Sequence, residues 1–248
     1  MNIHKFCLAI LLIFFCTALT AQKDPQRIID AAIDAHGGER FSASKIGFDF
    51  RDRYYSIERN GGNFTFKRIF TDSTGAVEDA LSNTGFTRRT NGEPVELSDE
   101  WQQKYSNSVN SVAYFALLPY RLNDAAVIKR YIGTSEIKGE PYYEVEITFQ
   151  KEGGGKDYED VFVYWIHQKN YTMDYLAYSY IVDGGGTRFR EALNVRTVNG
   201  IRFADYHNYK GAALGTDLST FDDLFQAGEF KKLSTIALEN ISVDLLTE

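Results

Sequence analysis

The sequence predicts a mostly β (α+β) protein, with a single curved antiparallel sheet or half-barrel of about 9–11 strands, an N-terminal helix and a helical lid or plug. Aromatic residues make up 15% of the chain, and this abundance favours β-strands. Apolar and polar residues alternate with a period of two along most of the sequence, whereas only two long stretches repeat with a helical period. The hydrophobic share of 44% and the charged share of 25% exclude a wholly disordered or fibrous chain.

Residues 1–21 are predicted to be a secretory signal peptide. The basic Lys5 precedes an apolar run over Phe6–Phe15, and small residues follow up to Ala21. The run is about ten residues long, whereas a membrane-spanning helix needs roughly 20. Lipoprotein processing at Cys16 is the alternative, but large aromatic residues precede this cysteine. We therefore expect one exported domain over residues 22–248, periplasmic or extracellular, without stable membrane insertion.

Composition excludes several kinds of function. Both cysteines, Cys7 and Cys16, lie in the predicted signal peptide, so the mature domain has no Cys nucleophile or Cys-based metal site. The remaining histidines, His36, His167 and His207, lie too far apart in sequence for a zinc motif, and we expect no metal and no cofactor. His36 is expected to interact with the dipole of the first helix. The net charge of −7 argues against nucleic acid as a partner.

The first half of the chain contains both long helical patterns. Asp24 is a suitable N-cap and Pro25 a suitable first residue for a helix that the glycines 37–38 end. Alternation over residues 46–51 and 64–68, around a glycine-rich turn, predicts a hairpin. A second helix is predicted from Ser98 to the residues before Pro119.

The second half is predicted to be antiparallel sheet with one short helix, over about residues 219–227. Asn199-Gly200 is a strong hairpin signal. The predicted strands cover residues 127–137, 142–149, 160–167, 171–182, 188–198, 201–209 and 230–246.

Two of these strands, over residues 162–166 and 175–182, are apolar on both faces. A sheet with one solvated face alternates apolar and polar residues, so both faces of these strands must contact apolar groups. Either helices and loops fill the space on both sides, or the concave face is an apolar cavity under a helical plug. The candidate cavity residues are Trp101, Tyr105, Phe115, Phe162, Tyr164, Trp165, Tyr178 and Tyr180.

Two hairpins carry a family resemblance. Ile137-Lys138-Gly139 leads into Tyr142-Tyr143-Glu144-Val145, and Val198-Asn199-Gly200 leads into Ile201-Arg202-Phe203. With the N-terminal helix ending in Gly-Gly, the long meander and the helical insertion, the chain resembles the LolA/LolB-like superfamily of outer-membrane lipoprotein carriers, and most closely its exported bacterial members. Ala204 stands where a proline is common in that superfamily.

The resemblance implies a half-open β-barrel in the periplasm, with helices as a lid over an apolar cavity for acyl chains. It also implies an arginine that pairs with the lid. Arg51, Arg53 and Arg68 are all candidates for this role, and the sequence does not distinguish among them.

The hairpin at Asn199-Gly200 collects polar residues on one predicted face. A two-residue loop pairs residue 198 with 201, 196 with 203, 194 with 205, 192 with 207 and 190 with 209. This face then carries Arg188, Arg190, Asn194, Arg196, Asp205, His207 and Tyr209. The arginines could meet an anionic group at a cavity mouth, with Arg190, Asp205, His207 and Tyr209 as rim candidates. The simpler interpretation is an ion-pair ladder on the outer surface. The opposite face, with Phe189, Leu193, Val195, Ala204 and Tyr206, is the predicted core side.

The functional prediction is a periplasmic carrier or sensor that binds an acyl chain, lipid or lipoprotein in a concave aromatic-lined sheet. The alternative is an exported protein-interaction or scaffold domain, with a filled core and an envelope protein as partner. A hydrolase that uses the paired carboxylates Glu144 and Glu146, or Asp205 with His207, is the third hypothesis. We expect a solvated surface around Glu144 and Glu146, and no G-x-S-x-G elbow is present, so no enzyme is predicted.

Overall fold

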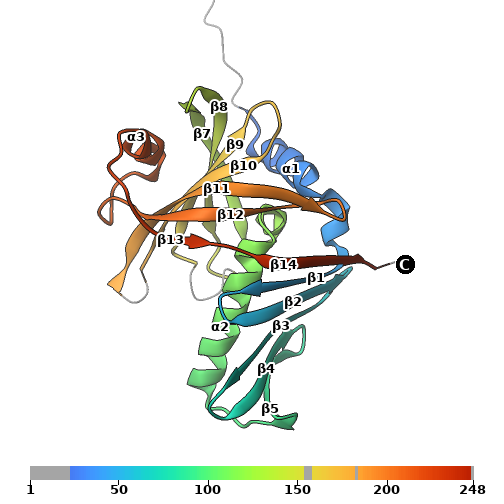
Figure 1. The fold of residues 1–248 in the computed structure, drawn as a ribbon. Helices are drawn as coiled ribbons and strands as arrows, with labels where there is room; N and C mark the ends of the chain where they lie inside the picture. The colour runs from blue at the N-terminus through green and yellow to red at the C-terminus, as the bar shows by residue number, and fades with distance from the viewer. Residues whose placement is uncertain (1–22, 154–157, 182–183, 247–248) are drawn as a thin grey trace, which may run out of the picture.

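A computed structural model describes residues 23–153, 158–181 and 184–246, so the predicted signal peptide over residues 1–21 lies outside the described residues. The described chain forms two curved antiparallel sheets of seven strands each, together with three α-helices. The predicted class, a mostly β protein with an open curved sheet and helices, is confirmed. The strands divide between two sheets, however, and are more numerous than predicted (Figure 1).

Sheet A has the strand order β14-β1-β2-β3-β4-β5-β6. Its strands are β1 (Ala43–Phe50), β2 (Arg53–Asn60), β3 (Asn63–Asp72), β4 (Gly75–Ser82), β5 (Gly85–Thr90), β6 (Glu93–Pro94) and β14 (Glu239–Leu245). The predicted hairpin is therefore wrong in detail, because β2 lies between its two arms and pairs with both β1 and β3. Alternation does not reveal β2, since Tyr55, Ser56 and Ile57 are buried in succession.

Sheet B has the strand order β13-β12-β11-β10-β9-β8-β7. Its strands are β7 (Val127–Ile137), β8 (Glu140–Phe149), β9 (Val161–His167), β10 (Met173–Tyr180), β11 (Gly186–Val198), β12 (Ile201–Lys210) and β13 (Lys231–Ile236). The single strand predicted over residues 230–246 is thus two strands, and β13 and β14 belong to different sheets. The two-residue link between them joins the edges of sheets A and B.

The three α-helices are α1 (Pro25–His36), α2 (Asp99–Ala116) and α3 (Phe221–Gln226). The side chain of Asp24 caps α1 by accepting a hydrogen bond from the backbone N–H of Gln26, as the sequence predicts. Short 3-10 helices span Gly38–Phe41, Tyr120–Asn123 and Leu218–Thr220. Among the described residues, no helix is both long enough and apolar enough to cross a membrane.

The helices explain why β9 and β10 are apolar on both faces. On the inner face of sheet B, Phe162, Tyr164 and Leu176 pack with α1 and with the segment that follows α2. On the outer face, Trp165 and Tyr175 pack under α3 and the residues around it. The helix α2 runs along the inner face of sheet A and ends against sheet B (Figure 1).

The register of the β11–β12 hairpin differs from the predicted one. Residues 198 and 196 pair with 201 and 203 as expected, but a bulge between Leu193 and Arg196 shifts the remaining pairs by one residue. Arg190 therefore lies opposite Asn208, while His207 lies opposite Glu191. A shift by one residue exchanges the faces of a strand, so Arg190 does not share a face with His207 and Tyr209. Val195, predicted on the core side, is 52% exposed.

Candidate ligand-binding cavities

A first cavity of about 310 Å³ lies between the C-terminal half of α2, the end of β1 and strands β10–β12. Its wall is mostly apolar, and the apolar members include Val112, Phe115, Leu118, Leu176 and Phe203. The charged members among the described residues are three arginines, Arg51, Arg190 and Arg202, without any Asp or Glu. This cavity is therefore an apolar space with a positive wall.

A second cavity of about 420 Å³ lies on the other side of α2, against β7–β11. Tyr114, Phe149, Phe162 and Tyr180 are among its aromatic lining residues. Its charged lining residues are of both signs: Arg121, Asp124, Asp160 and Arg188. The two cavities share the wall residues Ser111, Phe115 and Tyr178. The rings of Phe115 and Tyr178, with centroids 5.7 Å apart, thus separate two adjoining spaces.

Arg190 is the most buried of the three arginines on the wall of the first cavity, and its partners among the described residues do not include a carboxylate. Its side chain is only 8% exposed, and its guanidinium lies 4.1 Å from the ring centroid of Phe115. Nη2 donates a hydrogen bond to the Tyr178 hydroxyl at 3.0 Å, whereas the buried Nε has no hydrogen-bond partner among the described residues. A buried cation is costly unless it is paired, so this arrangement leaves part of the desolvation cost uncompensated.

Arg202, in contrast, has an acidic partner. Nη2 donates to Oδ1 of Asp174 at 3.0 Å, and Nη1 donates to Nε2 of His36 at 2.9 Å. The Nδ1–H of His36 can donate to the carbonyl oxygen of Ala32, 2.8 Å away, which leaves Nε2 free to accept. Burial, together with the charge of Arg202, lowers the pKa of His36 to about 4. His36, in the last turn of α1, is therefore neutral at pH 7, so its expected interaction with the helix dipole does not include a full positive charge at that pH.

Tyrosine hydroxyls are among the neutral polar groups near the cavities. Burial raises the pKa of Tyr206, on the wall of the first cavity, to about 12, although Arg202 and Arg190 oppose this. Burial also raises the pKa of Tyr114, on the second cavity, to about 12. Neither group ionises at neutral pH, so neither supplies a negative charge to pair with Arg190.

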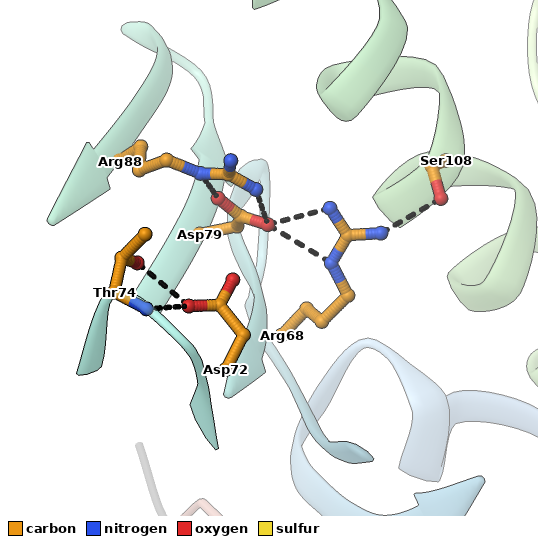
Figure 2. Close-up of polar contacts among 6 residues, drawn as sticks. All are labelled: Arg68, Asp72, Thr74, Asp79, Arg88 and Ser108. Atoms are coloured by element: carbon orange, nitrogen blue, oxygen red, sulfur yellow. Dashed lines mark hydrogen bonds and ion pairs between the residues drawn. The ribbon is translucent and has the colours of Figure 1, made fainter. Parts of the chain in front are cut away.

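The middle of α2 is attached to sheet A by a buried ionic network (Figure 2). Asp79, on β4, is completely buried and accepts hydrogen bonds from Arg68 on β3 and Arg88 on β5. Nη1 of Arg68 also donates to Oγ of Ser108 on α2 at 2.8 Å. The guanidinium of Arg88 stacks on the ring of Tyr105, 3.6 Å from its centroid. The network therefore joins three strands to the helix that borders both cavities.

The structure separates the three arginines that the sequence could not distinguish. Among the described residues, Arg68 is the one of the three with a hydrogen bond to α2. Arg51 lines the first cavity, and Arg53 lies over the ring of Phe70.

The residues proposed from sequence for the cavity fall into three groups. Phe115 and Tyr178 line both cavities, and Phe162 and Tyr180 line the second. Tyr164 is fully buried in the core of sheet B, and Trp165 is buried on the opposite, outer face against Phe189. Trp101 is 44% exposed at the start of α2, where it stacks on Tyr105, and neither lines a described cavity.

The four proposed rim residues lie in different parts of the structure. Arg190 lines the first cavity, as described above. Asp205 forms an ion pair with Arg196 at 2.9 Å and accepts a hydrogen bond from the backbone N–H of Leu238, so it holds the link between β13 and β14. His207 and Tyr209 lie on the other face of the hairpin from Arg190, and Tyr209 contacts Phe225 of α3. The hairpin thus carries one ion pair, between Arg196 and Asp205, and one arginine, Arg190, in the wall of the first cavity.

The carboxylates of the hydrolase hypothesis lie outside the cavities. Glu146 pairs with Arg130 on the surface at 2.7 Å. Glu144 is only 8% exposed, so the expectation of a solvated surface is wrong for this residue. It lies under α3, where burial raises the pKa of its carboxyl, and the nearby Asp222 adds to this effect. Within the described ranges, no group of three or more His, Cys, Asp or Glu side chains is placed to hold a metal ion.

Sequence reasoning missed several cavity residues. Arg202 and Leu176 were not singled out, and Tyr206 was assigned to the core side of the hairpin. Leu176 does follow from the pattern, because it lies on the same strand face as Tyr178. Nothing in the sequence signals that Arg202 pairs with both His36 and Asp174, since that contact joins three distant elements.

Two crystal structures are similar to this fold over nearly its full length. A LolA superfamily protein from Nitrosomonas europaea aligns with a TM-score of 0.51 and 12% sequence identity, covering 90% of this chain and 94% of that protein. A DUF1329 family protein from Desulfovibrio piger aligns with a TM-score of 0.50 and 10% identity, covering 91% and 96%. The predicted resemblance to the LolA-like superfamily is confirmed at the level of the fold.

Among curated proteins, no sequence matches significantly. A family model does match, over residues 4–239, and its description is that of a family of unknown function, DUF6503. Because the match covers most of the sequence, the chain belongs to the DUF6503 family.

Proposed function

We propose that the protein is a periplasmic carrier or sensor that binds an apolar ligand with an acyl chain beneath α2. The observation that carries the proposal is the pair of adjoining cavities, of about 310 and 420 Å³, with Phe115 and Tyr178 as their common wall. Cavities of a few hundred Å³ with mostly apolar walls and a few polar groups are typical of small-molecule sites. The LolA-like fold and the predicted signal peptide support the same assignment.

The physical basis is burial of an alkyl chain. Each methylene removed from water contributes about 0.8 kcal/mol, so a chain of about ten carbons gains roughly 8 kcal/mol before the entropy cost of binding. Val112, Phe115 and Leu176 provide the apolar contacts for such a chain. Phe115 and Tyr178 lie between the two cavities with their rings tilted against each other, so a change of their rotamers would join the cavities for a longer ligand.

A scaffold domain with a filled core is the weaker hypothesis, because open space remains beside α2 on both sides. A hydrolase based on Glu144 and Glu146 is also weaker, since one is covered by α3 and the other pairs with Arg130. We therefore propose binding without catalysis.

The test is uptake of the neutral fluorescent probe N-phenyl-1-naphthylamine by the folded protein, followed by displacement with hexadecanol. We expect saturable binding and complete displacement. Ser111 borders both cavities, so Ser111→Phe should reduce the affinity for the probe by about tenfold or more by filling the space. Ser106→Phe, on the same helix, is the matched control because Ser106 lines neither described cavity.

Wild-type protein that is folded by circular dichroism but shows no saturable uptake would contradict the proposal. The same conclusion follows if Ser111→Phe and Ser106→Phe bind the probe equally well.

A further inference from the structure

The wall of the first cavity has a charge pattern that is opposite to that of the whole chain. The protein has a net charge of −7, yet the described residues of this wall include Arg51, Arg190 and Arg202 and no carboxylate. Only Arg202 has an acidic partner, Asp174, within ion-pair distance among the described residues. Two of the three arginines on this wall, Arg51 and Arg190, thus have no described carboxylate within ion-pair distance.

Arg190 is the more deeply buried of these two arginines. More than nine-tenths of its surface is buried, and no described carboxylate forms an ion pair with it. Its contacts are the Tyr178 hydroxyl, at 3.0 Å from Nη2, and the face of Phe115. These contacts compensate a buried guanidinium only in part, and the Nε–H is left without an acceptor among the described residues.

The neutral groups around Arg190 do not provide a counter-ion. Tyr206 stays protonated and His36 stays uncharged at neutral pH, as described above. A guanidinium is a planar donor that binds carboxylate and phosphate oxygens through two parallel hydrogen bonds. The side chain thus has the chemistry of a receptor for an anion, in a position where the remaining wall is apolar.

We infer that the ligand of the first cavity is an anionic single-chain amphiphile, whose carboxylate or phosphate head group binds Arg190 and whose alkyl chain lies against Val112, Phe115 and Leu176. The inference rests on the proposed function and adds the chemical class of the ligand. The head group would then bind at the arginine, and the chain would extend from there along the apolar wall of the same cavity. Arg51, at the same wall, would add a second positive charge near the head group.

The test is displacement of bound N-phenyl-1-naphthylamine by three amphiphiles with the same chain: hexadecanol, hexadecanoate and hexadecyl phosphate. For the wild type we expect at least one of the two anions to displace the probe at a concentration about tenfold or more below that of hexadecanol. The better of the two anions identifies the head group as carboxylate or phosphate.

Arg190→Met should abolish the preference for the anion, so that the two anions displace the probe no better than hexadecanol does. Arg190→Lys should retain part of the preference, because it keeps the charge but loses the planar donor. Arg89→Met is the matched control, since Arg89 is exposed on β5 and lines neither cavity.

Equal displacement by the alcohol and the anions in the wild type would overturn the inference and leave the proposed function in place. An anion preference that survives in Arg190→Met would do the same. Failure of all three amphiphiles to displace the probe would overturn both the inference and the proposed function.

Discussion

The buried network around Asp79 makes a prediction about stability that follows directly from its geometry. Asp79 has no exposed surface and accepts hydrogen bonds from two guanidiniums, at 2.9 Å from Nε of Arg68 and 2.6 Å from Nε of Arg88 (Figure 2). The substitution Asp79→Asn keeps the shape of the side chain but removes its charge. Both arginines then remain in the interior without a counter-charge.

The expected loss follows from how buried each arginine is. Removing one partner of a buried ion pair costs about 3–5 kcal/mol, because the other charge stays desolvated. Arg68 is only 3% exposed and cannot reach water, whereas Arg88 is 12% exposed and can shift outward along Tyr105. We therefore expect the lower part of this range, a loss of about 3 kcal/mol in the free energy of unfolding.

Urea denaturation followed by circular dichroism measures this quantity. Glu78→Gln is the matched control, because Glu78 lies next to Asp79 on the same strand but is 37% exposed and pairs with Lys67 on the surface. A surface pair of this kind contributes about 0–1 kcal/mol. If Asp79→Asn and Glu78→Gln have the same effect within about 0.5 kcal/mol, the network does not stabilise the fold and the reasoning is refuted.

Three further predictions follow from other buried groups. His36 has a pKa of about 4 in the folded protein, below its unfolded value of 6.5, so the free energy of unfolding should fall by about 3 kcal/mol as the pH falls through this window. In urea titrations at pH 7.5 and 4.5, His36→Gln should remove this pH dependence, and a pH dependence that persists in the variant would assign it to other groups. Burial raises the pKa of Glu144, so its ionisation opposes folding as the pH rises above 4.5. Glu144→Gln should therefore be at least as stable as the wild type at pH 7, and a loss of more than about 1 kcal/mol in the free energy of unfolding would argue against this. A Cβ at Gly211 would lie 2.6 Å from Cε2 of the buried Phe221, so Gly211→Ala should destabilise the fold by about 1–3 kcal/mol and lower its melting temperature. Gly62→Ala is the control, because the space around Gly62 is open. Equal melting temperatures of the two variants would count against the packing at α3.

Much of the fold follows from local sequence patterns. The start of α1 at Pro25 depends on the capping chemistry of Asp24, and the two faces of β9 and β10 follow from their uninterrupted apolar residues. Both signals are carried by neighbouring residues, so they can be detected without knowledge of the rest of the chain. The same is true of Phe115 and Tyr178, which were proposed for the cavity and line it.

Features that depend on distant residues were not predictable in this way. The bulge between Leu193 and Arg196 places Arg190 on the opposite face of the hairpin from His207 and Tyr209, yet the alternation of the strand does not indicate this bulge. Likewise, no local pattern separates β13 from β14, because the division results from which sheet edge each segment meets. The cavities depend on the relative placement of α2 and both sheets, which only the assembled structure provides.

The division of the C-terminal segment has a consequence for how the chain reaches its native state. β1, near the start of the domain, pairs with β14, the last strand that the structure describes, as in Ser44 opposite Leu245. Contacts of such long range form slowly, and β1 presents an unpaired edge until β14 has been synthesised. Sheet A is therefore complete only after almost all of the described residues have been synthesised, although its strands β1–β6 all lie in the first half of the chain.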